Sequence, residues 1–500
     1  MEEKNTPQSP HFPTGKQEFW LLIAMAVCSV LIVDFALYGG LNLGFAIMSI
    51  LISVLSTVYL RKKRPGPYCI CLFILNLIIA ASFIRSDDGF VKFVMLCFLL
   101  LSGNLQLTLL AGQNRRKSSG ITSLLDAPRA FFALGFGQLG NSMGGLNDAR
   151  KNGGPAVRNN VAILTGLVIA VPVLAILIPL LIEADAAFEG LVGLLPAFNL
   201  SETIIALMFG IPLACILYTR NAALKHKPKE VPAPWKGKQF NPLTINTVLV
   251  MVCLLYLVYL ISQLAYFVGG FSGILPEEYT MAQYARRGFF EMAWLAAINL
   301  GIMTVCVGLT EKKGGRTPLL TRLLCLFIGI ITLFFTVAAS AKMLLYIDSY
   351  GLTRLRLLTE VIMIFIALTV IFVAIWLFRP KFAYMKAVLL TALLMGSCVA
   401  WADVDTVVAA YNVNAYQTGR LATVDISHLS SLGDGAIPYI EELTKDQNQN
   451  VSLHAKRVLI NYGSNDEDLR SFNIASSLAE DILARYRVDS EEQVDSGFQS

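Results

Sequence analysis

The chain has 500 residues, of which 55% are apolar and only 15% are charged, with a mean hydropathy of +0.61. These values exclude an ordinary soluble globular protein, in which about a quarter of the residues are charged. The net charge of +5 has two opposed parts, because residues 1–401 hold 33 Lys and Arg against 19 Asp and Glu, whereas residues 402–500 hold 7 against 16. A basic excess at helix ends is typical of membrane proteins, so we expect no nucleic-acid partner.

Residues 1–18 are polar and carry Lys4 and Lys16, so we expect a cytoplasmic N-terminal segment. An apolar run begins at Phe19, and no small-residue cleavage site follows it at the distance of a signal peptidase site. The sequence therefore predicts a retained first helix in place of a cleaved signal peptide.

The chain contains eleven mostly apolar runs, of which the run beginning at Phe19 is the first. Each is suited to a helix that crosses a hydrocarbon core about 30 Å thick. The predicted spans are residues 19–38, 41–60, 68–84, 90–111, 160–183, 201–219, 243–267, 289–309, 318–346, 355–378 and 383–401. They predict an all-α fold in which residues 19–401 form a polytopic transmembrane helical bundle. All nine cysteines lie in these runs, so we expect them to pack as small hydrophobic side chains.

Two of the predicted inner loops are long. Residues 112–159 mix apolar residues with Pro128 and several glycines, which indicates an interfacial or re-entrant element. Residues 135–140 match a GxGxxG pattern, but no strand precedes them, so they predict no nucleotide site. Residues 220–242 are basic and proline-rich, which is typical of a loop that lies on anionic lipid headgroups.

The basic residues of the membrane region alternate between the two sides. With the N-terminus in the cytoplasm, 26 Lys and Arg fall in inner loops and seven in outer loops. This bias follows the positive-inside rule, so it predicts a cytoplasmic N-terminus. Because the number of predicted spans is odd, the C-terminus is predicted to be extracytoplasmic.

The acidic tail has apolar residues at helical spacing, interrupted by glycines near residues 433–435 and 463. We expect residues 402–487 to form a small extracytoplasmic helical domain. A domain of this size has a marginal core, so we expect it to dock near the outer face. Residues 488–500 are polar and are predicted to be a disordered tail.

Several charged residues lie near the outer ends of the predicted spans, where they form a candidate polar cluster. Its members are Asp34, Tyr284, Arg286, Arg287, Glu291, Lys342, Arg354, Arg356 and Glu360. Arg287 and Glu291, and likewise Arg356 and Glu360, have the i,i+4 spacing of helical ion pairs. Charges at this depth have two interpretations: interfacial anchors that reach the headgroups, or the lining of an outward-facing polar cavity.

Some segments of the chain resemble a known family. They are Glu183–Phe188, Tyr284–Glu291, Tyr350–Arg356, Asn412–Asn414, Leu429–Leu432 and Ala436–Pro438. Together they resemble a bacterial membrane family described as domain of unknown function four-one-seven-three, which is related to domain four-one-five-three. The resemblance covers about residues 160–440 and leaves out the first 110. It implies a bacterial cytoplasmic membrane protein and places two signature segments at the outer face, but it brings no established activity.

The sequence favours a binding or accessory role at the outer face, where an envelope protein or a small ligand is the expected partner beside the lipid bilayer. One alternative is a transporter with an outward-facing polar cavity. Another is a membrane-embedded enzyme acting on a lipid-linked substrate, with Glu291 or Glu360 as general base. No catalytic, cofactor-binding or metal-binding residues are predicted, which leaves enzyme activity undecided and favours its absence.

Overall fold

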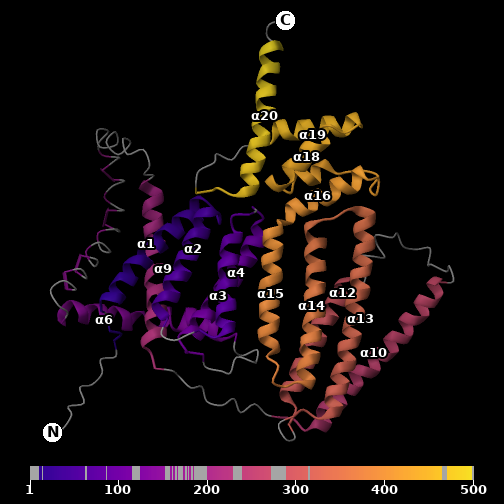
Figure 1. Ribbon diagram of the computed structural model, residues 1–500, viewed down its shortest axis with the longest axis horizontal. Coiled ribbons are helices and arrows are strands. Elements are labelled where there is room, and N and C mark those ends of the chain that lie inside the picture. The colour runs from indigo at the N-terminus through magenta and orange to yellow at the C-terminus, as the bar shows by residue number, and fades with distance from the viewer. Residues whose placement is uncertain are drawn as a thin grey trace. The chain divides into compact units, whose positions relative to one another are not determined.

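A computed structural model describes residues 11–13, 15–61, 65–85, 87–114, 124–152, 200–228, 239–271, 289–312, 316–463 and 470–497, with scattered positions between 158 and 184. The described part is helical and contains no strand, although an isolated bridge joins Phe240 and Thr310. The α-helices (Figure 1) are α1 (Lys16–Tyr38), α2 (Leu43–Leu60), α3 (Pro67–Ser82), α4 (Gly89–Leu110), α5 (Asp126–Pro128), α6 (Leu139–Asn152), α9 (Leu200–His226), α10 (Pro242–Phe271), α12 (Phe289–Leu309), α13 (Leu319–Tyr350), α14 (Arg354–Phe378), α15 (Tyr384–Ala402), α16 (Val404–Gln417), α17 (Ile426–Ser430), α18 (Ile437–Leu443), α19 (Gln449–Asn461) and α20 (Ile474–Gly497). Short turns of π-helix and 3-10 helix are η2 (Arg129–Ala133), η3 (Phe136–Gln138) and η4 (Asp434–Ala436).

Eight helices in the described part are long and apolar enough to cross a membrane, and two shorter apolar helices accompany them. The eight are α1, α2, α4, α9, α10, α13, α14 and α15, and the shorter ones are α3 and the Trp294–Leu309 part of α12. The chain is therefore a multi-pass helical membrane protein. The predicted fifth span, residues 160–183, falls mostly outside the described residues, so the count of eleven stays a prediction.

One predicted boundary is wrong by two turns. The sixth span was predicted to end at residue 219, but α9 continues to His226. Residues 220–226 contain neither proline nor glycine, and their three apolar residues, Ala222, Ala223 and Leu224, are buried. No helix-breaking residue ends α9 at residue 219, and the apolar side chains that follow are buried. Arg220 therefore lies inside α9 and not in the loop predicted for residues 220–242.

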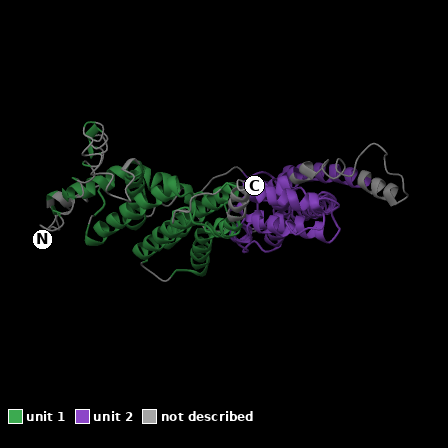
Figure 2. Ribbon diagram, turned by 90° about the horizontal axis from the view of Figure 1, so that it is seen from above, with its two compact units in different colours: residues 1–116, 122–231, 462–485 green, residues 117–121, 232–461, 486–500 purple. Residues whose placement is uncertain are grey.

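The chain divides into two compact units, shown in separate colours in Figure 2. Unit 1 comprises residues 1–116, 122–231 and 462–485, and unit 2 comprises residues 117–121, 232–461 and 486–500. The predicted tail domain, residues 402–487, contributes to both units, and whether it forms a domain of its own stays a prediction. Residues 488–500 were predicted to be a disordered tail, whereas helix α20 continues through this segment as far as Gly497.

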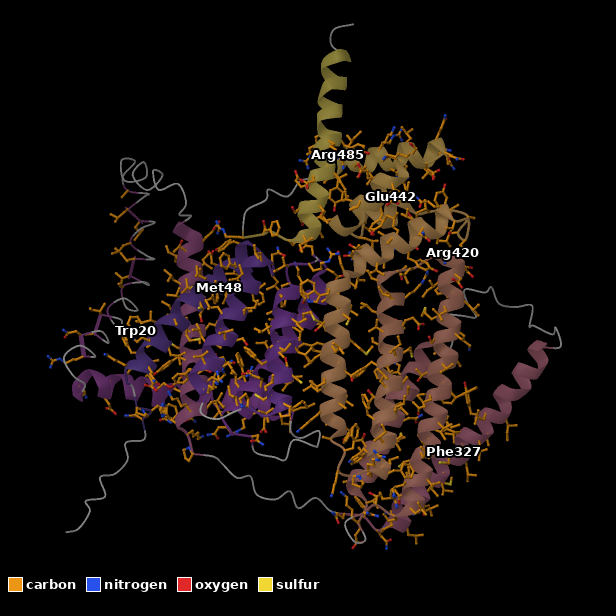
Figure 3. All side chains as sticks on the ribbon, in the orientation of Figure 1. Trp20, Met48, Phe327, Arg420, Glu442 and Arg485 are labelled. Carbon is orange, nitrogen blue, oxygen red and sulfur yellow. The ribbon has the colours of Figure 1, made fainter. Side chains whose placement is uncertain are left out.

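In unit 1, α1 packs along α9 and against α2, and α2, α3 and α4 follow as neighbours. The crossing of α1 and α9 is close: a Cβ atom added to Gly210 would lie 2.6 Å from the Cα atom of Val30. A small residue at this point lets the two helix backbones approach, as is common between helices in membranes. Trp20 on α1 is 65% exposed (Figure 3), as expected of an aromatic residue at a membrane boundary.

In unit 2, α13 packs against α10, α12 and α14, and α15 against α14. Its core includes three predicted apolar-run cysteines, Cys253, Cys306 and Cys325, whose exposed fractions are 7%, 8% and 0%. They are free thiols and pack as the small hydrophobic side chains that the sequence predicts. After α15 the chain turns at Asp403 into α16, which packs against α14 and α15.

The helices that follow α15 in unit 2 have a small core of their own. Val408, Leu429, Ile437, Ile440 and Leu443 are each at most 1% exposed. Polar side chains such as Arg420 and Glu442 lie in the same helical region (Figure 3). Leu429 lies in α17, and Ile437, Ile440 and Leu443 lie in α18, so the predicted helical spacing, interrupted near residues 433–435, is confirmed.

Candidate functional site

The turn from α13 to α14 has a backbone that glycine alone adopts without strain. Gly351 ends α13 with φ +77°, and a Cβ atom there would lie 2.5 Å from Oδ1 of Asn412. Thr353 caps the start of α14 by accepting a hydrogen bond from the backbone N–H of Arg356 at 3.4 Å. The turn therefore depends on a glycine that is both left-handed and in close contact with another helix.

Asn412 of α16 holds this turn through both groups of its amide. Its Oδ1 accepts from the backbone N–H of Leu352 at 2.7 Å, and its Nδ2 donates to the carbonyl of Leu352 at 2.8 Å. Asn412 is 7% exposed and Leu352 is 6% exposed. The buried backbone groups of a single residue are thus satisfied by one side chain.

Arg354, at the first turn of α14, links the same turn to two further elements. Its Nε donates to Oδ1 of Asp405 on α16, and its Nη2 donates to the carbonyl of Leu432 at 2.8 Å. Asp405 is 4% exposed, so its charge is removed from water and needs this cation.

Arg356 caps the end of α13. Its Nη1 donates to the carbonyl of Tyr350 at 3.1 Å and to that of Gly351, and its guanidinium lies 4.1 Å from the centre of the Tyr346 ring. A cation at this position stabilises the carbonyl end of a helix. The predicted partner Glu360 instead accepts from the hydroxyl of Ser340 at 2.5 Å, so Arg356 and Glu360 engage different groups.

Tyr411 supplies one more link between α16 and α13, through a hydrogen bond of 3.3 Å from its hydroxyl to Oδ1 of Asp348. Burial raises the pKa of Tyr411, and the negative charge of Asp348 raises it further. The phenol therefore stays protonated near neutral pH and can donate.

A pocket of about 380 Å³ lies beside this turn. Its lining comprises Ser349, Tyr350, Gly351, Leu352, Thr353, Asn412, Leu421, Ala422, Thr423, Val424, Asp425, His428 and Leu429. Nε2 of His428 has no hydrogen-bond partner, whereas Oδ1 of Asp425 caps α17 through the backbone N–H of His428. The volume falls within the range of about 300–1,000 Å³ that is usual for ligand pockets.

The structure brings only part of the predicted polar cluster to this turn. Arg354 and Arg356 lie there, and Lys342 and Glu360 lie further along α13 and α14. Glu291 is on α12, but its side chain is outside the described part, as are residues 284, 286 and 287. The remaining member, Asp34, belongs to unit 1.

In unit 1, Asp34 pairs with a residue far along the chain. Its Oδ2 lies 3.6 Å from Nη1 of Arg470, which also donates to Glu202 of α9 at 3.0 Å. Residues 470–474 thereby contact the helix ends where α1 finishes. The backbone carbonyl of Ile84, after α3, accepts from Ile474 at 2.9 Å.

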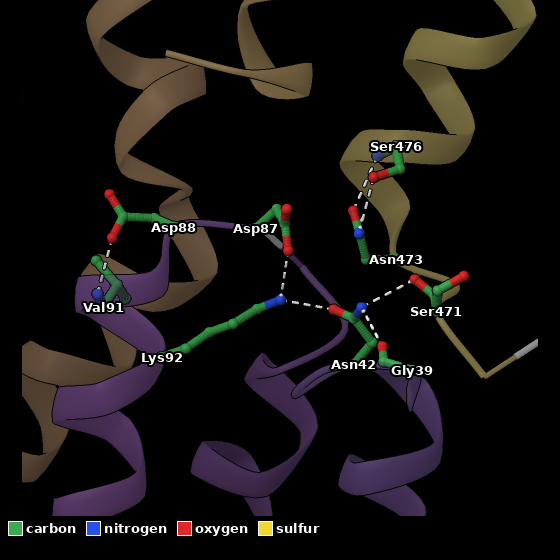
Figure 4. Close-up of polar contacts among 9 residues, drawn as sticks. All are labelled: Gly39, Asn42, Asp87, Asp88, Val91, Lys92, Ser471, Asn473 and Ser476. Atoms are coloured by element: carbon green, nitrogen blue, oxygen red, sulfur yellow. Dashed lines mark hydrogen bonds and ion pairs between the residues drawn. The ribbon is translucent and has the colours of Figure 1, made fainter. Parts of the chain in front are cut away.

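Asn42, the residue before α2, is the centre of this attachment (Figure 4). Its Nδ2 donates to the carbonyls of Gly39 and Ser471 at 2.8 and 2.9 Å, and its Oδ1 accepts from Nζ of Lys92 at 2.6 Å. Lys92, which is 7% exposed, also donates to Asp87 at 2.8 Å. Lys92 could have been suspected from its place one turn inside an apolar helix, but no local pattern singles out Asn42.

The described residues contain no group of three or more His, Cys, Asp or Glu that could hold a metal ion. The contacts around the α13–α14 turn serve instead to fix backbone geometry beside a pocket. Together with the eight apolar helices of the described part, they describe a multi-pass membrane protein in which the helices after α15 in unit 2 are hydrogen-bonded to the α13–α14 turn.

The family model described as domain of unknown function DUF4153 matches residues 21–443, and the chain belongs to this family. The match includes the first helices, which the predicted resemblance left out. The sequence resemblance named four-one-seven-three and mentioned four-one-five-three only as its relative, so membership of four-one-seven-three and its relation to DUF4153 both stay predictions. No curated protein and no solved structure matches the chain.

Proposed function

We propose that this protein is a binding or accessory protein of the bacterial cytoplasmic membrane, and that its ligand site is the pocket beside the α13–α14 turn. The observation that carries the proposal is a pocket of ligand size whose wall is fixed from several elements. Asn412 of α16 and Arg354 of α14 hold that wall in place. A wall held in this way needs little reordering when a ligand binds, which favours affinity.

The chemistry of the lining favours a small ligand with both polar and apolar parts. Hydroxyl-bearing residues of the lining are Ser349, Thr353 and Thr423, and His428 also lines the pocket. Aliphatic side chains such as Leu421 complete the lining. A few polar groups set in an apolar wall give orientation and specificity to a bound molecule.

The orientation proposed for the chain puts this pocket outside the cytoplasm. With 26 basic residues in inner loops and seven in outer loops, the N-terminus is inside and the α13–α14 turn is outside. A pocket there would meet soluble molecules or proteins of the cell envelope, and the acidic tail would lie on the same side.

Filling the pocket tests the proposal. Ala422 lines the pocket, so Ala422→Trp would occupy it, whereas Gln417→Trp places the same side chain on an exposed position outside it. Full-length protein in nanodiscs of neutral lipid would be incubated with the low-molecular-weight fraction of a bacterial periplasmic extract and examined by native mass spectrometry. We expect a bound mass on the wild type and on Gln417→Trp that is absent from Ala422→Trp. Equal binding by all three proteins, or none by the wild type, would overturn the proposal.

A further inference from the structure

Arg220 is a charged residue in the interior of unit 1. It lies six residues before the end of α9, which is about 9 Å inside the helix end, and it is 6% exposed. An arginine stays protonated in proteins, so a full positive charge sits within a helix that is long and apolar enough to span a membrane. Such residues in spans are rare and are usually tied to function.

The hydrogen-bond partners of Arg220 in the described part of the chain are all neutral. Its Nη1 donates to Oδ1 of Asn104 on α4 at 3.2 Å, and its Nη2 donates to the hydroxyl of Ser56 on α2 at 3.4 Å. Its Nε has no hydrogen-bond partner. No described carboxylate forms an ion pair with it.

A carboxylate does occur at the same end of unit 1, but other cations and donors occupy it. Oε1 of Glu18 accepts from Tyr59 at 3.1 Å and from Lys225 at 3.1 Å, and it lies 3.2 Å from Nε2 of His226. Glu18 is thus already matched by Lys225, which leaves the charge of Arg220 without a described counterion.

The residues directly before and after Arg220 in α9 also have polar atoms without hydrogen-bond partners. Asn221 donates to Ser56 at 3.0 Å, but its Oδ1 has no partner, and the same holds for Oγ1 of Thr219. Both residues are 0% exposed. Buried polar groups are nearly always satisfied. The N–H of Arg220 Nε is a buried donor on a charged group with no partner, so it indicates an additional acceptor such as an anion or an ordered water, whereas Oδ1 of Asn221 can only accept and does not contact an anion.

We propose that Arg220, with Asn104 and Ser56, forms an anion-binding site in the interior of unit 1. The ligand is a compact anion that presents a negative atom to the guanidinium, either a free inorganic anion or the phosphate of an anionic lipid. Arg220 supplies the charge, and Asn104 and Ser56 hold its guanidinium in place. This proposal does not depend on the pocket in unit 2.

The test measures the thermal stability of the full-length protein as a function of anion. Because a ligand that binds only the folded state stabilises it, a bound anion raises the melting temperature in a saturable way. In nanodiscs of phosphatidylcholine, sodium gluconate would be exchanged for sodium chloride or sodium phosphate at constant ionic strength. A parallel series would replace part of the phosphatidylcholine by phosphatidylglycerol.

Three variants separate a site from a general salt effect. Arg220→Gln removes the charge, Arg220→Lys keeps it, and Lys151→Gln removes an exposed charge of α6. We expect the wild type and Lys151→Gln to respond alike, Arg220→Gln to lose the response, and Arg220→Lys to need roughly tenfold more anion, since it lacks the planar donor fork.

The two series identify the source of the anion. An Arg220-dependent response to chloride or phosphate in neutral lipid assigns a free anion, and one that requires phosphatidylglycerol assigns a lipid phosphate. No response of the wild type in either series, or an equal response in Arg220→Gln, would overturn the proposal. If Arg220→Gln does not fold, the comparison of the wild type with Arg220→Lys decides the matter, and an equal response of these two proteins would also overturn the proposal.

Discussion

Replacing Asn412 by alanine removes both hydrogen bonds that its side chain makes with the backbone of Leu352, at 2.7 and 2.8 Å. The N–H and carbonyl of Leu352 would then lack their partners within a site that is 6% exposed. Each unsatisfied buried group costs about 1–3 kcal/mol, but the adjacent pocket admits water that can replace part of the loss. We therefore expect Asn412→Ala to lower the stability of unit 2 by about 2–4 kcal/mol.

The assay can use the protein's own thiols. In a background where the other six cysteines are replaced by alanine, Cys253, Cys306 and Cys325 remain, each at most 8% exposed in the core of unit 2, so a fluorogenic thiol reagent reports the unfolding of unit 2 as they become accessible. In a folded body of 150–250 residues, 1 kcal/mol corresponds to roughly 2–4 °C, so the melting temperature of Asn412→Ala should fall by about 4–16 °C.

Asn414 is the matched control, because it lies on the same helix but is exposed and accepts its hydrogen bond from Arg420 at the surface. Asn414→Ala should change stability by less than about 0.5 kcal/mol. If Asn412→Ala and Asn414→Ala melt at the same temperature, the two buried hydrogen bonds do not hold the α13–α14 turn and the reasoning fails.

Three other measurements address two further contacts and the orientation of the chain. Gly351→Ala should destabilise unit 2 by about 1–3 kcal/mol in the same thiol assay, because φ is positive and the new methyl group meets Asn412, and an unchanged melting temperature would contradict this. In a double-mutant cycle, Arg354→Ala and Asp405→Ala should show a coupling of about 1–3 kcal/mol, and additive losses would indicate that their ion pair contributes nothing. A reporter fused after Ser500 should be active only outside the cytoplasm, and cytoplasmic activity would refute the predicted orientation.

Hydropathy was sufficient to predict the class of fold. Most predicted spans coincide with helices, because about 20 apolar residues in a row have few other stable states in a membrane. The end of α9 was missed since a charged residue is normally the signal that a span is over. Arg220 is accommodated by Asn104 and Ser56, which lie more than 110 residues earlier in the chain.

The candidate site was predictable only in part. Arg354 and Arg356 were expected near the end of a span and lie beside the pocket, but the i,i+4 rule paired Arg356 with Glu360. That rule considers neighbours on one helix, whereas Arg356 finds nearer acceptors in the carbonyls at the end of α13. Arg354 meets Asp405, 51 residues later, and no local spacing predicts such a pair.

The family match shows a different kind of gap. Short motifs of the family could be recognised only where polar residues and glycines interrupt the apolar sequence, as in residues 350–356. The first helices are so uniformly apolar that no short motif in them is distinctive, yet the family model extends back to residue 21. A full-length model weighs many weak preferences at once, which reading by motif cannot do.

The attachment of Ser471 to Asn42 has a consequence for how the protein is made. These residues are 429 positions apart, and chains grow at about 5–20 residues per second, so Asn42 is synthesised roughly 20–90 s before its partner. During that interval the first helices are already inserted, while Asn42 and Lys92 lack one member of their hydrogen-bonded group. A chain that stops before residue 470 never supplies it, so this contact distinguishes finished molecules from prematurely ended ones.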